Sequence, residues 1–317
     1  MSLVTKQDIE QAATSLRGVA VRTPLLPAPW LAHDHHDVRL KCENLQRAGS
    51  FKIRGAYTML SRLAEAERQC GVITYSSGNH GQALALAAQM FGVKAVVVMP
   101  TTAPAVKVAG AQRLGADVIF EGTTSTERQR RAVDLAAEHG YTVVPPFEHP
   151  NIIAGQGTVG LEILDAWPNV GAILVPIGGG GLASGVAAYV KQTRPGCRVI
   201  GVEPENADAM YQSLLAHQPV TIAAKGTIAD GLQPVRPGDL TYKHAAEFVD
   251  EIVRVSDDAI RDATRALLQS GKLVVEFSGA ATVAALMSRA YEPGERGVAA
   301  ILSGGNFDPG KLVELLR

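Results

Sequence analysis

Lys52 is the side chain with the clearest capacity for covalent chemistry in this sequence. It lies in the segment 49–56 (GSFKIRGA), among apolar and small residues. Burial disfavours the charged ammonium form of an amine, and a neutral amine can attack a carbonyl carbon. A lysine beside a phenylalanine often does no more than extend along an apolar surface into solvent. Lys52 is therefore a candidate nucleophile whose role depends on the other motifs of the chain.

A run of four glycines forms a second motif: Gly178, Gly179, Gly180 and Gly181. It lies between the apolar run 172–177 and a helical pattern over 182–193, where a strand passes into a helix. Glycines allow backbone N–H groups to converge on an anion, and the positive end of the helix dipole adds attraction. The run therefore predicts a phosphate-binding loop.

The same glycines also match a dinucleotide-binding pattern. The spacing is Gly178-x-Gly180-x-x-Ala183, and Glu203 closes the next predicted strand at a suitable distance for a ribose contact. An NAD-dependent oxidoreductase is therefore an alternative, although it gives no role to the other unusual segments.

Two further polar turns follow predicted strands. Residues 76–81 (SSGNHG) bring Ser76, Ser77, Asn79 and His80 to one loop, where they could bind a carboxylate or a ring oxygen, or simply cap a helix. Residues 303–306 (SGGN) follow the last apolar strand, at the end where open α/β sheets bind ligands. Ser303 could donate a hydrogen bond to a heteroaromatic nitrogen, or belong to an ordinary turn.

The elements that must position these residues alternate between strands and helices, which predicts an α/β protein. Strands are expected at 71–75, 94–99, 117–120, 141–144, 172–177, 198–202 and 299–302, and helices at 82–91, 105–114, 126–139, 152–167, 182–193, 257–269 and 280–289. Pro145 and Pro146 interrupt the series. We therefore expect two open, twisted parallel-sheet lobes flanked by helices, with the ligand in the cleft between them.

The composition narrows the possible partners. The chain has 317 residues, 46% of them hydrophobic, and a formal net charge of -1, so neither nucleic acid nor an anionic membrane is expected to bind it. Three scattered cysteines, Cys42, Cys70 and Cys197, fit a reducing cytoplasm better than a disulfide framework. The first ten residues lack the pattern of a signal peptide, and no long uncharged apolar run follows. We expect a cytoplasmic protein that binds a small molecule.

Together the motifs resemble those of pyridoxal-phosphate enzymes of the tryptophan-synthase-β type, also called fold type II. More narrowly, the sequence resembles the serine/threonine dehydratase and serine racemase family. The resemblance extends over nearly the whole chain, through the segments 23–25, 41–46, 50–56, 76–81, 153–158, 178–181, 229–231 and 303–306.

The resemblance implies a role for each motif. Lys52 resembles the Schiff-base lysine, Phe51 the residue beside the cofactor ring, Asn79 the partner of the ring hydroxyl, and Ser303 the partner of the pyridine nitrogen. The glycines 178–181 resemble the phosphate loop. The substrate carboxylate is expected at Ser76, Ser77, Asn79 and His80, with His80 structural rather than catalytic.

The implied reaction is β-elimination. A serine hydroxyl cannot keep the pyridine nitrogen protonated as an aspartate would, which favours rapid loss of a β-substituent over transamination. L-threonine and L-serine are the expected substrates, with 2-oxobutanoate or pyruvate and ammonia as products and Lys52 as the base. Serine racemase activity, with Ser77 acting on the opposite face of Cα, and 3-hydroxyaspartate dehydratase activity remain alternatives. A protein that binds pyridoxal phosphate without turnover is a further one.

Three secondary expectations concern metals, domains and assembly. Glu203 and Ala207 resemble the start of a mono- or divalent cation site, but Ala209 occupies the position of the expected aspartate, with Asp208 beside it. The cluster 33–37 (HDHHD) looks like a metal site but lies in a polar loop. We expect a large cofactor-binding domain from residues 1–62 and 147–317, a small substrate-carboxylate domain from residues 63–146, and a homodimer.

Overall fold

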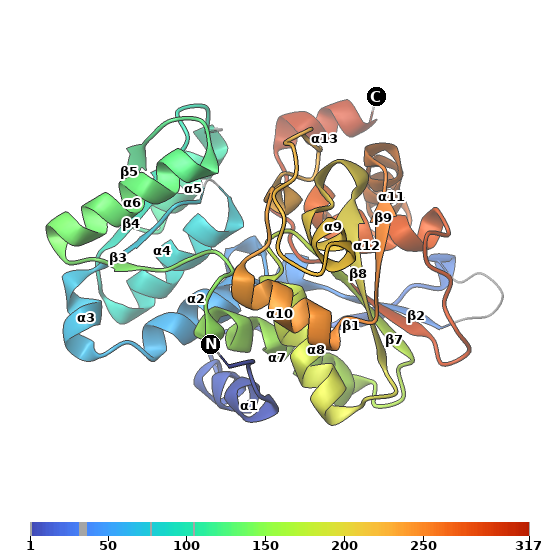
Figure 1. Cartoon of the computed structure of the whole chain (residues 1–317). Helices are drawn as coiled ribbons and strands as arrows, with labels where there is room; N and C mark the ends of the chain where they lie inside the picture. The colour runs from blue at the N-terminus through green and yellow to red at the C-terminus, as the bar shows by residue number, and fades with distance from the viewer. Residues whose placement is uncertain (1, 32–36, 77, 104, 317) are drawn as a thin grey trace.

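The computed structural model describes residues 2–31, 37–76, 78–103 and 105–316, which form two β-sheets flanked by helices (Figure 1). The six-stranded sheet has the order β1 (Leu25–Pro27), β2 (Val38–Lys41), β10 (Val298–Ile301), β7 (Ala172–Pro176), β8 (Arg198–Pro204) and β9 (Glu251–Val255). The four-stranded sheet has the order β5 (Asp117–Phe120), β4 (Ala95–Met99), β3 (Val72–Thr74) and β6 (Thr142–Val143). The predicted α/β fold with two parallel-sheet lobes is confirmed.

One edge strand departs from the parallel pattern. β1 pairs antiparallel with β2, with Leu26 opposite Leu40, whereas the other pairs in both sheets are parallel. Successive strands joined without a crossover helix can pair antiparallel, because the chain only has to turn back on itself.

Thirteen α-helices lie in the described residues: α1 (Lys6–Ser15), α2 (Lys52–Ser61), α3 (Glu65–Cys70), α4 (Asn79–Phe91), α5 (Ala105–Arg113), α6 (Ser125–His139), α7 (Pro150–Ala166), α8 (Gly181–Thr193), α9 (Ala209–Leu215), α10 (Asp239–Phe248), α11 (Asp257–Gln269), α12 (Phe277–Met287) and α13 (Pro309–Leu316). Five short 3-10 helices join them: η1 (Pro29–Leu31), η2 (Glu43–Leu45), η3 (Arg47–Gly49), η4 (Glu205–Ala207) and η5 (Asp230–Leu232).

The predicted helices are present, but three of them start two or three residues earlier than expected. Helices α4, α7 and α12 begin at Asn79, Pro150 and Phe277, each two or three residues before the start that the apolar pattern indicated. Their first turns contain polar residues, proline or glycine, which an apolar periodicity does not register. In α7 the side chain of His149 accepts a hydrogen bond from the backbone N–H of Asn151 at 3.1 Å and so caps the helix.

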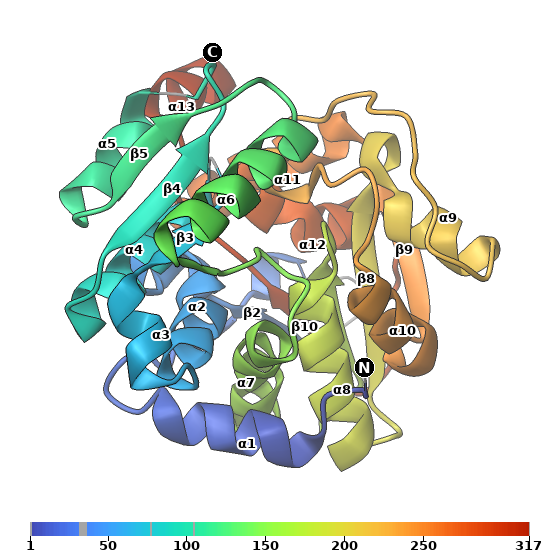
Figure 2. The same cartoon turned by 60° about the vertical axis from the view of Figure 1, so that its left-hand side comes forward.

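Helix α7 lies between α2 and α8 and brings the two main motifs together (Figures 1 and 2). A β-carbon placed on Gly155 would lie 2.4 Å from the carbonyl oxygen of Arg54 in α2. One placed on Gly185 of α8 would lie 2.2 Å from the carbonyl oxygen of Ile153 in α7. Such close backbone packing requires glycine, and it fixes the helix that carries Lys52 relative to the helix that follows the four glycines.

Separate apolar clusters stabilise the two lobes. One face of the six-stranded sheet packs against α7 and α8 through residues such as Ile153, Ile173 and Val186, all fully buried. The other face packs against α11 and α12. The four-stranded sheet has α4 on one face and α6 on the other. Within the described ranges, no helix combines the length and the apolar character needed to cross a bilayer.

Candidate active site

The four glycines and Ser303 follow adjacent strands of the larger sheet. β7 and β10 are parallel neighbours, so the turns that follow them lie at the same edge. The backbone N–H of Phe51 donates to the carbonyl oxygen of Ser303 at 3.1 Å, and Ser50 forms an antiparallel bridge with Gly304. The segment that carries Lys52 is therefore joined directly to the turn after β10.

Lys52 begins helix α2 and is partly buried. Its Nζ donates to the carbonyl oxygen of Pro146 at 2.7 Å and lies 5.2 Å from the centre of the Phe51 ring. Burial lowers the pKa of Lys52 to about 8. A useful fraction of the amine is therefore neutral near physiological pH, as its proposed reactivity requires.

Phe147 connects Lys52 to the glycine run. It follows Pro146, and a β-carbon placed on Gly179 would lie 2.2 Å from its ring. One on Gly181 would lie 3.0 Å from the Phe147 β-carbon. Gly180 has φ of 93° and occupies the N-cap position of α8, with no side-chain cap. Side chains are therefore excluded from the loop, and the first N–H groups of α8 lack the capping side chain that usually satisfies one of them, which is the arrangement an anion requires.

The loop before α4 matches the prediction in part. Ser76 Oγ accepts a hydrogen bond from the N–H of Gly78 at 3.3 Å, and Ser77 lies outside the described residues. Gly78 occupies the N-cap position and Asn79 is the first residue of α4, so of the two candidate capping residues, Ser77 and Asn79, Asn79 does not cap the helix and Ser77 is not described. A β-carbon placed on Gly78 would meet no atom of the described residues within 4 Å, so the space beside this glycine is open.

His80 is buried and held by the backbone. Its Nε2 lies 3.0 Å from the carbonyl oxygen of Val144. A carbonyl only accepts hydrogen bonds, so Nε2 carries the hydrogen and Nδ1 is an acceptor. Among the described residues this buried Nδ1 has no hydrogen-bond partner. Burial, assisted by the charge of Lys52, lowers the pKa of His80 to about 3, so the ring is neutral.

The side chain of Asn79 contacts two residues of the larger lobe. Its Nδ2 donates to Glu276 Oε1 at 2.5 Å, and its Oδ1 accepts from Asn306 Nδ2 at 2.8 Å. Sequence reasoning assigned no role to either partner. The one sequence feature that could have indicated Glu276 is its position as a single carboxylate in the apolar stretch 273–277 (LVVEF).

A buried ionic cluster lies on the other side of α2 from Lys52. Arg54, 1% exposed, donates to Glu43 through Nε and Nη2, both at 2.8 Å, and to Glu162 through Nη1 at 2.7 Å. Lys41 donates to Glu162 at 2.5 Å. Burial opposes each charge, but the carboxylates raise the pKa of Arg54 and the two cations lower the pKa of Glu43. We call these four residues the ionic cluster.

The carboxylates of the predicted cation site already have partners. Glu203 is fully buried and accepts from the N–H groups of Met210 at 3.0 Å and Tyr211 at 2.8 Å, while burial raises its pKa to about 8. Asp208 accepts from Arg254 at 3.1 Å and from Gln212 at 2.8 Å. The Glu203 carboxylate is therefore also unavailable to the ribose of a dinucleotide.

Among the described residues, no group of three His, Cys, Asp or Glu side chains is placed to hold a metal ion. Ala207 is buried in η4, and Ala209 begins α9 with no ligand atom in its side chain. Residues 33–36 of the predicted polar cluster lie outside the described residues. Asp37, at the end of this cluster, accepts hydrogen bonds from Arg39.

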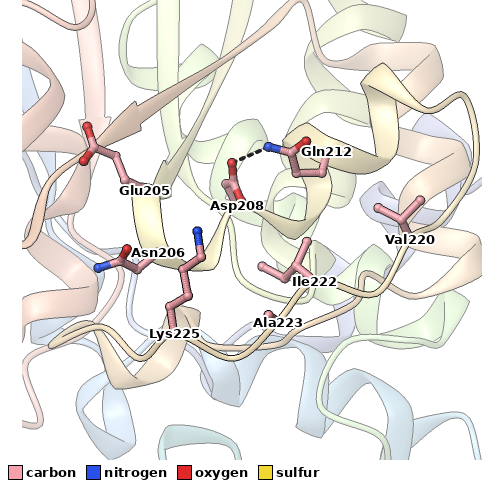
Figure 3. A pocket seen from close by; sticks show the side chains of 8 residues that line it. All are labelled: Glu205, Asn206, Asp208, Gln212, Val220, Ile222, Ala223 and Lys225. Carbon is pink, nitrogen blue, oxygen red and sulfur yellow. Dashed lines mark hydrogen bonds between the residues drawn. The ribbon is translucent and has the colours of Figure 1, made fainter.

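A cavity of about 320 Å³ lies beside this segment (Figure 3). It is lined by Glu205, Asn206, Asp208, Gln212, Val220, Ile222, Ala223 and Lys225. Figure 3 shows the hydrogen bond between Asp208 and Gln212 in its wall. None of the residues grouped around Lys52 lines it, so it is separate from the candidate active site.

The chain belongs to the pyridoxal-phosphate dependent enzyme family, whose sequence pattern matches residues 16–304. It is 43% identical to L-threonine ammonia-lyase of Thermotoga maritima, over 96% of this chain and 76% of that protein. It is 41% identical to L-threo-3-hydroxyaspartate ammonia-lyase of a Pseudomonas species, over 100% of both chains. Among solved structures it resembles maize serine racemase, with a TM-score of 0.94 and 36% identity, covering 99% of this chain and 97% of that one.

The site residues fit pyridoxal phosphate. The amine of Lys52 has a lowered pKa, the glycine loop has no space for side chains, and the buried Nδ1 of His80 has no partner among the described residues. The amine suits the aldehyde of the cofactor, and the uncapped helix start suits its phosphate.

Proposed function

We propose that this protein is a pyridoxal-phosphate-dependent ammonia-lyase that converts L-threonine, L-serine or both into 2-oxobutanoate or pyruvate and ammonia. The reaction removes water from the amino acid and then consumes water to release ammonia. Two relatives that align with nearly the whole of this chain carry ammonia-lyase names, which supports this reaction class. The observation that carries the proposal is the partly buried Lys52 amine, which donates to the carbonyl of Pro146, the residue before the Phe147 that packs against Gly179 and Gly181.

The cofactor would be held by residues from both lobes. The glycine loop and the start of α8 would bind its phosphate, Phe51 would lie beside its ring, Ser303 would donate to the ring nitrogen, and Asn79 to the ring hydroxyl. The start of α4, with Ser76 and Ser77, would bind the substrate carboxylate. His80, neutral and held by Val144, would maintain the loop rather than transfer a proton.

Pyridoxal phosphate supplies an aldehyde that reacts with amines and a ring that stabilises negative charge at the substrate α-carbon. The protein must then supply a base near that carbon. The Lys52 amine, with a pKa of about 8, would accept the α-proton, and its neighbour Pro146 offers an uncharged carbonyl that holds the amine in place. Ser303 would keep the ring nitrogen uncharged, which favours departure of the β-hydroxyl over transamination.

A second candidate substrate is L-threo-3-hydroxyaspartate. The Pseudomonas relative that carries this name aligns with this chain from end to end. Serine racemisation is a further candidate because the sequence has a serine at position 77, whose hydroxyl could act on the opposite face of Cα. Loss of D-serine formation in Ser77→Ala, with dehydration retained, would support that activity.

The decisive experiment combines absorbance and product analysis. The purified protein should absorb in the near-visible range with pyridoxal phosphate, and Lys52→Ala should lose this band and at least ~1,000-fold of the activity. Lys243→Ala, a lysine on the exposed surface of α10, is the matched control. Ammonia release and keto-acid identity over serine, threonine and 3-hydroxyaspartate would identify the substrate. A colourless protein that takes up no cofactor would refute the proposal.

We also propose a division of labour between the lobes, with residues 1–62 and 147–317 binding the cofactor and residues 63–146 the substrate carboxylate. The strands of the smaller sheet all come from residues 72–143, which supports this division. The balanced charge and scattered cysteines support a cytoplasmic protein. A homodimer, which light scattering during gel filtration can test, completes the proposal.

A further inference from the structure

The orientation of the Asn306 side chain is set by the main chain. Its Nδ2 donates to the carbonyl oxygen of Ala48 at 2.8 Å, and a carbonyl can only accept, so this atom must be the amino nitrogen. The same nitrogen donates its second hydrogen to Asn79 Oδ1 at 2.8 Å. Gly49 leaves room for the amide, because a β-carbon there would lie 2.1 Å from Asn306 Oδ1.

This orientation determines that of Asn79. The atom of Asn79 that faces Asn306 must accept a hydrogen bond, so it is the oxygen, and the amino group therefore faces Glu276. One N–H of Asn79 donates to Glu276 Oε1 at 2.5 Å. The second N–H is the one donor of this amide that neither partner uses.

Glu276 is held against the turn that contains Ser303. It is 5% exposed, and its backbone N–H donates to the carbonyl oxygen of Gly304 at 3.1 Å. A β-carbon on Gly304 would lie 2.1 Å from Glu276 Oε1 and 3.0 Å from Asn79 Nδ2. The Asn79 amide and the Glu276 carboxylate therefore both pack on the residue next to Ser303.

We propose that Ala48, Asn306, Asn79 and Glu276 form an orienting chain that fixes the Asn79 amide with its remaining N–H directed at the ring of the bound cofactor. Asn306 and Glu276 are thereby positioning residues. The inference rests on the proposed role of Asn79 as the partner of the ring hydroxyl. Because Asn79 begins α4 and the other members belong to the larger lobe, the chain also ties the two lobes together at the cofactor.

The charge of Glu276 adds a pH dependence to this orientation. Burial, with the nearby Asp230 of η5, raises the pKa of Glu276 to about 8, against the opposing effects of Asn79 and of Lys107 from α5. Lys107 itself contacts Asp230. An ionised carboxylate accepts the Asn79 hydrogen bond more strongly than a protonated one. The environment of the ring hydroxyl should therefore change between about pH 7 and pH 9.

Asn306→Asp tests the chain directly, because it removes both donors with little change of shape. The dissociation constant of pyridoxal phosphate, titrated into cofactor-free protein, should rise about tenfold. The circular dichroism of the bound cofactor band should fall by about half or more, because the ring is held less rigidly. Asn206→Asp makes the same change at an exposed site and should leave both quantities unchanged. A folded Asn306→Asp variant with a dissociation constant within about twofold of wild type and an unchanged band would overturn the proposal.

Glu276→Gln keeps an acceptor for Asn79 and removes the charge. Its affinity for the cofactor should change less than about threefold, but the absorbance change of the bound cofactor centred near pH 8 should disappear. Glu292→Gln, on the exposed surface, should retain it. A pH profile that is the same in Glu276→Gln and wild type would show that Glu276 does not act on the ring. Failure of the proposed function differs from both outcomes, because the wild-type protein itself would then bind no cofactor.

Discussion

Two cations of helix α2 lie in opposite electrostatic surroundings. Lys52 donates to one neutral carbonyl, and burial lowers its pKa to about 8. Arg54, two residues later and almost fully buried, contacts two carboxylates that raise its pKa. Two residues correspond to about 200° around a helix, so these side chains leave opposite faces. The comparison shows that the charge state of a basic side chain depends on its partners, since the same helix carries an amine of lowered pKa on one side and a guanidinium paired with two carboxylates on the other.

The largest change in the free energy of unfolding is expected when the ionic cluster loses Arg54. Arg54→Met leaves Glu43 and Glu162 without their main cation, and should lower the free energy of unfolding by about 3–5 kcal/mol. Urea denaturation of the cofactor-free protein measures this. Glu43→Gln in the same background should recover part of the loss, because the unpaired charge is removed. A loss below about 1 kcal/mol would show that the cluster contributes little.

A smaller effect on stability is expected from the titration of His80. Its ring is neutral in the folded protein, so it adds no second positive charge near Lys52. The pKa of His80 is about 3 in the folded protein, against an ordinary 6.5. The unfolded chain therefore binds more protons between these values, and stability falls as the pH is lowered through this window. Between pH 7 and pH 5 this costs about 2 kcal/mol, which His80→Gln should remove.

Unfolding free energies at pH 7 and pH 5 test the prediction for both proteins. An equal loss in wild type and His80→Gln would contradict it. His139→Gln, at an exposed site of α6, is the control and should behave like wild type.

Lys52→Met should change the free energy of unfolding in the opposite direction from Arg54→Met. Because the pKa of Lys52 is lowered by burial, the charge destabilises the cofactor-free fold at pH 7, and its removal should raise the free energy of unfolding by about 1–2 kcal/mol after allowance for partial exposure. The gain should shrink from pH 8 to pH 10.5, where the wild-type amine becomes neutral. If this variant is destabilised as Arg54→Met is, the contrast between the two sides of α2 is wrong.

The smallest change in stability is expected at an exposed ion pair, which serves as the reference for the buried ionic cluster. Arg22 and Asp165 form an exposed pair at 3.2 Å, with 59% and 49% of the side chains accessible. Asp165→Asn should change the free energy of unfolding by less than about 1 kcal/mol, and salt should reduce the difference further. A change as large as that of Arg54→Met would mean that burial does not account for the strength of the ionic cluster.

Local sequence predicted the fold and the positions of the main motifs. The ends of these strands could be predicted because each glycine or serine turn follows a short apolar run. Parallel strands then bring those turns to one edge of the sheet. The antiparallel β1 was not predicted, since a three-residue strand has little periodicity. Glu276 and Glu162 were missed because their partners, Asn79 and Arg54, are distant in sequence and meet them only through packing.

The segment around Glu203 shows a further limit. The sequence placed carboxylates where a cation was expected, but it could not show that Glu203 already accepts two backbone hydrogen bonds or that Arg254 and Gln212 contact Asp208. Hydrogen bonds to main-chain groups leave no pattern in side-chain spacing.

The strand order of the smaller sheet has a consequence for how such enzymes can be recombined. Its first and last strands, β3 and β6, are neighbours, with Val72 opposite Thr142, so the chain enters and leaves this lobe at one place. The intervening segment is one continuous stretch of chain, and its core is completed from outside by apolar residues of α2 and α7 such as Ile53 and Ile152. A chimera that carries residues 72–143 of a relative would thus keep the glycine run 178–181 and the strand order of the larger sheet, provided that the incoming α4 fits the apolar face of α2.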